Sequence, residues 1–294
     1  MRHATPFADE ALGSPLRLLV IAPTATAEAA WGAVRVEMAA VDAALSRHRE
    51  DSELILLNHA SPGCIPVGGR LRHALALAWR AYRSSLGRFD PRIIGALEAA
   101  GDRAGVPLPS SPARLRPEER WLRADRHRRG VLAPVDLGGI GKGLALRWSA
   151  ERIRRLGVRD FLLEAGGDIV AAGSAPGGGW RVSLAGPDGQ RPLAVLELPV
   201  ASVALATSAQ TRRRHIIDPA TLRPVDGPAR QATVAGADPA WAEVRSKLAI
   251  LAGTPAGTER AWWYGADGRL RATASAREWV AWEALSPSAS SAAC

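Results

Sequence analysis

The feature that most constrains this chain is a glycine-rich segment at residues 135–143, VDLGGIGKG, followed about one helix and one strand later by Gly166-Gly167-Asp168. Glycine has no Cβ and tolerates positive φ, so the backbone of such a segment can approach a ligand closely. At a strand-to-helix corner, free N–H groups and the helix dipole favour negative charge. With an acid before the turn and a lysine in it, the segment predicts a site for a phosphate-bearing ligand.

Two common phosphate-binding loops do not match this segment. A P-loop requires a glycine six positions before its lysine and a Ser or Thr directly after it, but Asp136 and Gly143 occupy those positions. A dinucleotide-binding loop requires G-x-G-x-x-G, but the third glycine would fall on Leu144. Taken alone, the segment therefore leaves open a glycine-rich turn that binds no ligand.

Further motifs occur in a fixed order along the chain. They are DSELILLN at residues 51–58, GRFD at 87–90, ATS at 206–208 and HIIDP at 215–219. Together with the two glycine segments they resemble the FAD:protein FMN transferase family, the ApbE-like flavin transferases. The resemblance covers about residues 11–285 as one domain. It implies the ApbE-like architecture, which is related to the T-fold.

Hydrophobic periodicity independently predicts an α+β fold with a largely antiparallel sheet and packed helices, because short strands in series are broken by helices. The expected helices are residues 25–47, 69–86, 142–156 and 239–252. The expected strands are residues 16–22, 161–164, 169–172, 180–184, 194–198, 203–206 and 232–235, with three more around Trp262, Leu270 and Val280. Residues 101–120 are expected to form an irregular loop, and residues 286–294 a disordered tail.

Composition predicts a globular protein with a sizeable core, since 47% of the 294 residues are hydrophobic. Of 38 basic residues, only Lys142 and Lys247 are lysine. The arginines behind the net charge of +9 are dispersed, and no aromatic residues interleave with their longest run, residues 212–214, so nucleic acid is not an expected partner. Both lysines fall inside motifs, where a compact ammonium is not interchangeable with a guanidinium.

The remaining global features concern the compartment. Cys64 and Cys294 form no ligand or disulfide pattern. Residues 1–10 lack an apolar core, and the apolar residues 16–22 are interrupted by Arg17. We therefore expect no signal peptide, lipobox cysteine, transmembrane span or stable membrane insertion, and a cytoplasmic protein.

The family resemblance implies a specific reaction. FAD is cleaved at its pyrophosphate, FMN passes to a Ser or Thr hydroxyl of an acceptor protein, and AMP is released. Such a reaction needs in-line geometry, neutralised charge at the bridging oxygens and a group that takes the hydroxyl proton. The acceptor is expected to carry a small Asp/Gly/Ser/Thr-type motif. Its identity and the oligomeric state of the enzyme stay open.

The resemblance also assigns roles to individual residues. His215 is the predicted base, because imidazole titrates near working pH, and Lys142 is a predicted catalytic point charge near the pyrophosphate. Asp136 is expected to accept from ligand hydroxyls or adenine N–H groups. Structural alternatives stay open: an Asp136–Lys142 pair, a capping role for Asp168, a core position for Phe89 and a purely structural His215. The other predicted flavin contacts are Leu12, His48, Arg88, Phe89, Asp90, Gly166, Gly167, Asp168, Thr207, Ser208 and Ile216.

One family motif is altered in this chain. The pattern A-D-x-x-x-T reads AEVRSK at residues 242–247. In the family, the Asp and Thr of that helix hold Mg²⁺ together with a carbonyl of the glycine turn, so the resemblance implies Gly139, Glu243 and Ser246 as metal ligands here. A protonated Lys247 cannot be a ligand, since it has three donors and no lone pair. It can pair with Glu243 one helical turn away.

Two hypotheses follow from that alteration. In the first, the Lys247 ammonium occupies the place of the metal and acts in catalysis with little or no Mg²⁺. In the second, the metal site is lost and the protein binds FAD without transferring FMN. An FAD pyrophosphatase that releases FMN and AMP is a further alternative, and the transferase is the preferred interpretation. Other positions where the chain departs from the family pattern are Leu12-Gly13-Ser14 for MGT, His48 for an aromatic residue, Glu164 for Asn, and Ala209 and Leu222 for Gly.

Overall fold

The computed structural model describes residues 3–61, 63–102, 106–109, 121–124, 128–187, 189, 191–210, 215–255 and 259–284. Most of the predicted loop at residues 101–120 lies outside the described residues. So do the predicted tail at residues 286–294 and the arginine run at 212–214.

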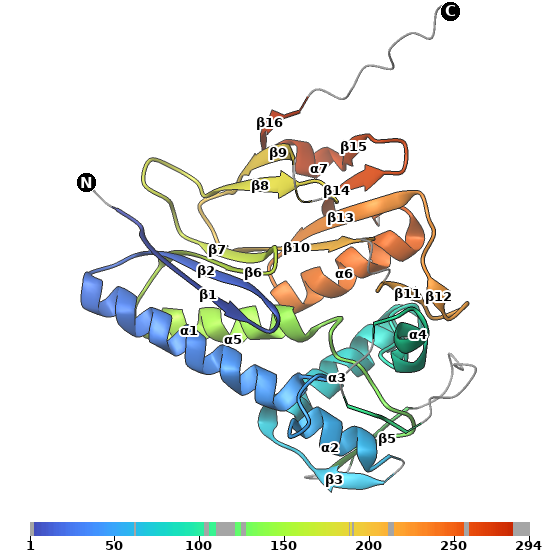
Figure 1. The fold of residues 1–294 in the computed structure, drawn as a ribbon. Coiled ribbons are helices and arrows are strands. Elements are labelled where there is room, and N and C mark those ends of the chain that lie inside the picture. The colour runs from blue at the N-terminus through green and yellow to red at the C-terminus, as the bar shows by residue number, and fades with distance from the viewer. Residues whose placement is uncertain are drawn as a thin grey trace, which may run out of the picture.

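An antiparallel sheet of eight strands lies at the centre of the molecule (Figure 1). Strand β2 alternates strictly, with Leu16, Leu18 and Val20 buried on one face while Leu19 and Ile21 turn to the other. This period of two is what a strand with different partners on its two faces requires. The strands in sheet order are β1 (Thr5–Ala11), β2 (Ser14–Ile21), β6 (Asp160–Ala165), β7 (Asp168–Ala172), β10 (Val203–Ala209), β13 (Ala229–Gly236), β14 (Arg260–Gly265) and β15 (Leu270–Ala272).

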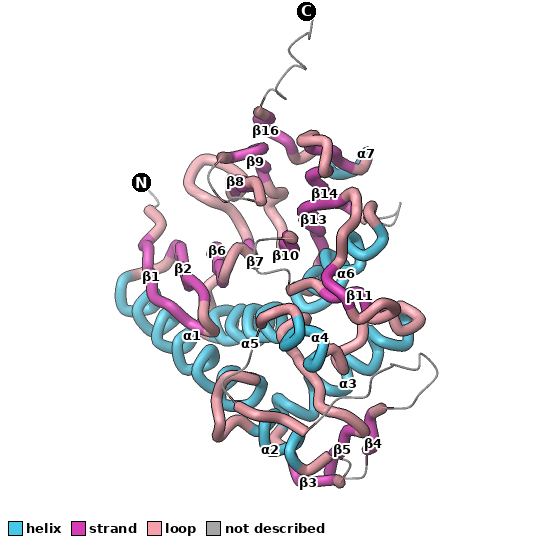
Figure 2. Tube along the Cα trace, turned by 45° about the vertical axis from the view of Figure 1, so that its right-hand side comes forward, coloured by secondary structure: helices cyan, strands magenta, loops and turns pink. Residues whose placement is uncertain are grey.

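Three helices cover one face of this sheet, and Figure 2 shows them together on one side of the strands. They are α1 (Thr24–Leu45), α5 (Gly141–Arg155) and α6 (Pro239–Ala252). In α1, the buried residues Val34, Met38, Val41 and Leu45 recur at three-and-four spacing, which gives the helix one apolar face. The main hydrophobic core lies between this helical layer and the sheet.

The opposite face of the sheet is covered by a second, three-stranded sheet. It consists of β8 (Arg181–Ala185), β9 (Pro192–Glu197) and β16 (Val280–Glu283), and the short helix α7 (Ala274–Arg277) lies beside it. Leu184 and Leu196 of this layer share a buried cluster with Leu162 and Leu205 of the central sheet. The inner strands of the central sheet are therefore buried on both faces.

A smaller unit of helices lies beyond the helical layer, at the lower end of the molecule in Figure 1. Glu37 of α1 is buried and receives hydrogen bonds from Arg70 and Arg152 at 2.7–2.8 Å, which ties α1 to this unit and to α5. Burial opposes ionisation of Glu37, but the two guanidinium groups outweigh it and lower its pKa. The elements of the unit are α2 (Glu53–His59), α3 (Gly69–Ser84), α4 (Ile94–Ala99), β3 (Cys64–Pro66), β4 (Leu122–Ala124) and β5 (Arg128–Val131).

The sequence-based predictions of the fold class, the four long helices and the predicted strands are confirmed. The sequence did not predict the strands β1, β3, β4 and β5, the short helices α2, α4 and α7, or the two-residue strands β11 (Ile217–Asp218) and β12 (Arg223–Pro224). Within the described residues, every helix is too short or too polar to cross a membrane.

Candidate functional site

The glycine corner connects a buried extended segment to the start of α5. The side chain of Asn58 on α2 fixes this segment with two hydrogen bonds. It donates to the carbonyl of Val135 at 3.0 Å and accepts from the Val135 N–H at 2.9 Å. Gly143, in the first turn of α5, allows α5 to touch α6, since a Cβ there would lie 2.5 Å from Cα of Ala240. The corner is therefore held from both sides, by α2 and by α6.

Both lysines of the chain converge on two carboxylates at this corner. Nζ of Lys142 lies 2.8 Å from Oδ2 of Asp168 and 3.9 Å from Oε1 of Glu243. Nζ of Lys247 lies 3.2 Å from the same Glu243 oxygen. Burial alone would lower the pKa of Lys142, but the adjacent carboxylates of Asp168 and Glu243 outweigh it and raise the pKa. The lysine therefore stays protonated at neutral pH.

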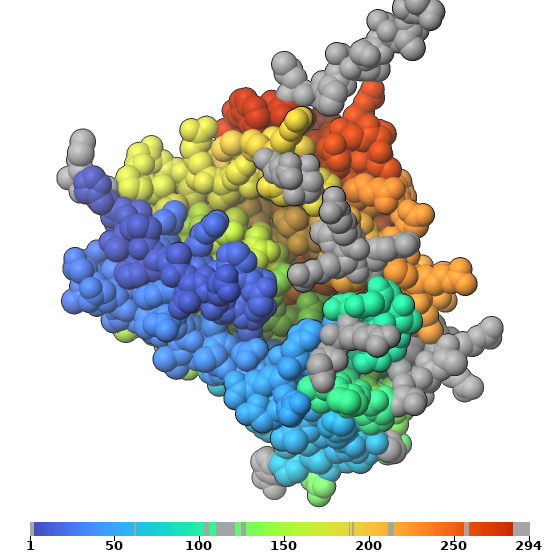
Figure 3. All heavy atoms as spheres, in the orientation of Figure 1, coloured from blue at the N-terminus to red at the C-terminus, as the bar shows by residue number. Residues whose placement is uncertain are grey.

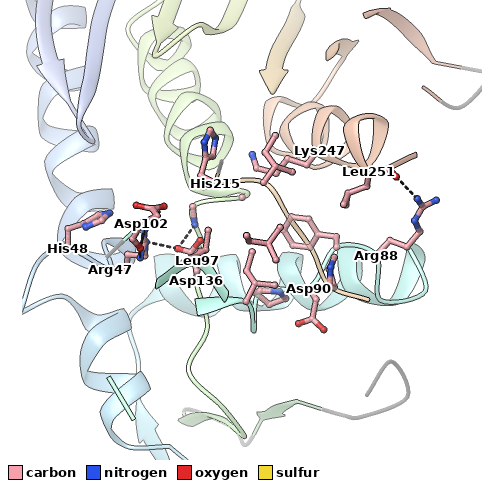
Figure 4. A pocket seen from close by; sticks show the side chains of 18 residues that line it. Arg47, His48, Arg88, Asp90, Leu97, Asp102, Asp136, His215, Lys247 and Leu251 are labelled. Atoms are coloured by element: carbon pink, nitrogen blue, oxygen red, sulfur yellow. Dashed lines mark hydrogen bonds and ion pairs between the residues drawn. The ribbon is translucent and has the colours of Figure 1, made fainter. Parts of the chain in front are cut away.

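Asp136 belongs to a second charged group at the edge of the corner. It accepts the N–H of Gly138 at 3.1 Å and lies 3.6 Å from Nε of Arg47, which also pairs with Asp102 at 2.8 Å (Figure 4). The alternative of a local pair between Asp136 and Lys142 is not realised, because Lys142 pairs with Asp168 instead. Arg47 was not predicted from the sequence, where its position beside the predicted His48 was the only signal for it.

Strand β10 lines the other side of the corner with hydroxyl groups. The Thr207 N–H donates to Oδ1 of Asp168 at 2.9 Å, so the capping role considered for Asp168 is realised. The hydroxyl of Thr207 lies 2.9 Å from that of Thr233. The hydroxyl of Ser208 lies 2.7 Å from that of Ser246 on α6. Asp168 thus orders both Lys142 and the backbone of β10.

Three adjoining hollows meet at Gly138, which lines all of them. Their volumes are about 290, 430 and 450 Å³. His215 and Lys247 line both the first and the second hollow, so the glycine corner and the HIIDP segment face a common space. Figure 3 shows the surface hollowed between the β1–β2 hairpin, in dark blue, and the α4 region, in teal.

Most of the predicted flavin contacts line these hollows. Arg88, Phe89, Asp90 and Ile216 line the first, Thr207 and Ser208 the second, and Leu12 the third, while His48 lies between the first and third. Gly166 and Gly167 also line the second, at a β6–β7 turn where both have positive φ, the geometry of a tight hairpin. Asp168 lies behind this turn, in contact with Lys142.

Two of these residues have strong structural partners. Arg92 donates two hydrogen bonds to the carboxylate of Asp90, from Nε at 3.0 Å and from Nη2 at 2.7 Å, and both side chains are buried. Figure 4 shows the Asp90 carboxylate turned away from His215 and Lys247. Phe89 is 7% exposed and belongs to the main core, as its structural alternative anticipated. A flavin contact for either residue stays a prediction.

The residues present do not fit a Mg²⁺ site. Oε2 of Glu243 already accepts the N–H of Gly143 at 2.8 Å, and Oε1 faces two ammonium groups. The hydroxyl of Ser246 donates to the Glu243 carbonyl at 2.9 Å. Among the described residues, no group of three or more His, Cys, Asp or Glu side chains is placed to hold a metal ion. The set of Gly139, Glu243 and Ser246 as metal ligands stays a prediction from the family resemblance alone.

The fold is that of the flavin transferases of known structure. The flavin transferase ApbE from Vibrio cholerae superposes with a TM-score of 0.79 at 20% sequence identity, covering 95% of this chain and 100% of that one. A sequence profile described as the ApbE family matches residues 12–264. This chain belongs to the ApbE family.

Relatives from several bacteria are named FAD:protein FMN transferase, and two of them match more than two thirds of this chain. The protein from Haemophilus influenzae is 24% identical over 230 residues, which is 69% of this chain and 66% of the relative. The protein from Klebsiella pneumoniae is 25% identical over 248 residues, 76% of this chain and 71% of the relative. The chain thus spans just under two thirds of the length of the H. influenzae relative.

Proposed function

We propose that this protein is an FAD:protein FMN transferase, which moves FMN from FAD to a Ser or Thr hydroxyl of an acceptor protein. The observation that carries the proposal is the common space faced by the glycine corner, His215 and Lys247. A protonated Lys142 in the first turn of α5 suits the two charged phosphates of a dinucleotide, since the dipole at a helix N-terminus also favours negative charge. The names of the relatives support the same activity.

The chemistry is a single displacement at phosphorus. The acceptor oxygen attacks the phosphorus of the FMN half, and the bond from that phosphorus to the bridging oxygen breaks. The bridging oxygen leaves with the electron pair as part of AMP. His215 takes the proton of the acceptor hydroxyl, a role that suits an imidazole at neutral pH. The product is an acceptor–FMN phosphoester.

The other groups position the dinucleotide. Lys142 is placed to neutralise charge on the bridging phosphates, and Asp168 holds its ammonium in position. Asp136, kept in place by Arg47 and the Gly138 N–H, is placed to accept from ligand hydroxyl or amino groups. Thr207 and Ser208 line the opposite wall, where the Ser208 hydroxyl is engaged by Ser246.

The test is to incubate purified protein with FAD and a panel of Ser- and Thr-containing peptides, and to measure AMP and FMN-labelled peptide. The proposal expects both in equal amounts. AMP with free FMN and no labelled peptide would identify a pyrophosphatase instead, and bound FAD with no AMP would identify a binding protein.

A histidine variant sharpens this test. His215→Asn is expected to lower the rate of AMP release by roughly 10²-fold or more while FAD still binds, because the general base is removed. His59→Asn is the matched control, since His59 is exposed on α2 and lines none of the three hollows. An unchanged rate in His215→Asn would contradict the role of His215.

A further inference from the structure

The lysine pair at the glycine corner is the most unusual charged group of the molecule. The chain uses arginine at all other basic positions, yet its two lysines come together from α5 and α6 on one buried carboxylate. The Glu243 side chain is 1% exposed, whereas that of Lys247 is 20% exposed and reaches the hollows. The carboxylate thus holds the Lys247 ammonium at the border between the first and second hollows.

We infer that the Lys247 ammonium is a built-in counter-charge for the bridging phosphates of the dinucleotide, so that the reaction proceeds without a bound divalent cation. The inference rests on the proposed function and deepens it. An ammonium has three N–H donors. Glu243 engages one from Lys247, and Asp168 engages one from Lys142, so each ammonium keeps donors for phosphate oxygens.

The surroundings of Lys247 favour an ammonium over a metal ion. Both Glu243 oxygens are engaged by N–H donors, so the carboxylate has its charge compensated before any ligand binds. A divalent cation beside it would meet two protonated amines within 4 Å of that carboxylate. The same two ammonium groups that repel a divalent cation attract the negatively charged phosphate oxygens of the dinucleotide. In the displacement at phosphorus, Lys247 would stabilise negative charge on the leaving phosphate of AMP.

The first measurement uses the unaltered protein. FAD affinity, measured from quenching of flavin fluorescence, and AMP release with an acceptor peptide should change less than about twofold between excess EDTA and excess Mg²⁺, because Lys247 supplies the charge. Titration with Mn²⁺ in the presence of FAD, followed by electron paramagnetic resonance, should show no stoichiometric bound Mn²⁺. Loss of FAD binding or AMP release in EDTA, or one bound Mn²⁺ per chain, would overturn the inference.

Variants of Lys247 provide the second measurement. Lys247→Met keeps a long side chain but removes its charge. It should weaken FAD binding about tenfold or more, because a charge-assisted hydrogen bond is lost. Lys247→Arg should restore part of that affinity. Lys247→Thr should make FAD binding depend on Mg²⁺ and should allow Mn²⁺ to bind. Equal FAD affinity in Lys247→Met and the unaltered protein would contradict the inference.

Arg245→Met is the matched control. Arg245 lies on the same helix, pairs with Glu259 at 3.4 Å and lines none of the three hollows, so its loss removes the same charge away from the site. It should leave FAD affinity unchanged. The two proposals fail separately: a protein that transfers FMN only with Mg²⁺ refutes the role of Lys247 alone, whereas a protein that never releases AMP refutes the proposed function.

Discussion

The link between α2 and the glycine corner offers a sharp test of how the site is built. Asn58 and Val135 are both fully buried, and two hydrogen bonds join the amide of one to the backbone of the other. Asp136 follows directly and is held by a bond from its N–H to the carbonyl of Pro91 at 2.7 Å. Asn58→Ala removes both partners of Val135 at once.

The expected cost follows from that geometry. The substitution leaves one buried N–H and one buried C=O without a partner, at about 1–3 kcal/mol each, so the free energy of unfolding should fall by about 2–6 kcal/mol. FAD affinity should fall by about tenfold, equivalent to about 1.4 kcal/mol, because the Asp136 corner loses its anchor.

Urea denaturation and fluorescence titration with FAD measure these two effects. Ser61→Ala is the control, since the Ser61 hydroxyl donates a single hydrogen bond to the Val131 carbonyl at 2.9 Å in the same region. Ser61→Ala should lower the free energy of unfolding by only about 1 kcal/mol. An Asn58→Ala variant that is no less stable than Ser61→Ala would refute this prediction, because the two hydrogen bonds between Asn58 and Val135 would then contribute nothing to stability.

Two further predictions concern buried ion pairs. Glu37→Gln should lower the free energy of unfolding by about 1–3 kcal/mol at neutral pH. Because the folded pKa of Glu37 lies below its unfolded value of 4.5, this stability is present above pH 4.5 and is lost as pH falls through the folded pKa. Urea midpoints from pH 3 to 7 should therefore fall less steeply with acid in the variant, and parallel curves would contradict the role of Glu37. Asp90→Asn should cost about 3–5 kcal/mol, since it breaks a buried two-point ion pair with Arg92. Normal stability with lost FAD binding would instead support Asp90 as a flavin contact.

The sequence predicted the long elements because their signals are local. The three-and-four spacing of Val34, Met38 and Val41 is already a helix face before any partner is known. The short helices α2 and α4 were missed because six or seven residues hold too few turns for a periodic pattern. Strand β1 was missed because most of its residues are exposed or half-buried, so it shows no buried alternation.

Partnerships across the chain had no such local signal. The motif order indicated the family, and the i,i+4 spacing of Glu243 and Lys247 indicated that they could pair. Nothing in the sequence indicated that Arg47 would reach Asp102 and Asp136. Such pairs depend on which helix ends meet, and that is decided by packing.

The sequence by itself determined the long elements, the family and the scarcity of lysine, since each is a property of residue identity and spacing. Only the tertiary structure decided that Lys142 and Lys247 share the carboxylate of Glu243, 101 residues from the first and four from the second. The physical reason is that the close contact of α5 with α6 at Gly143 brings these charges together. A side chain's neighbours across a packed interface follow from the whole fold and cannot be read from its own segment.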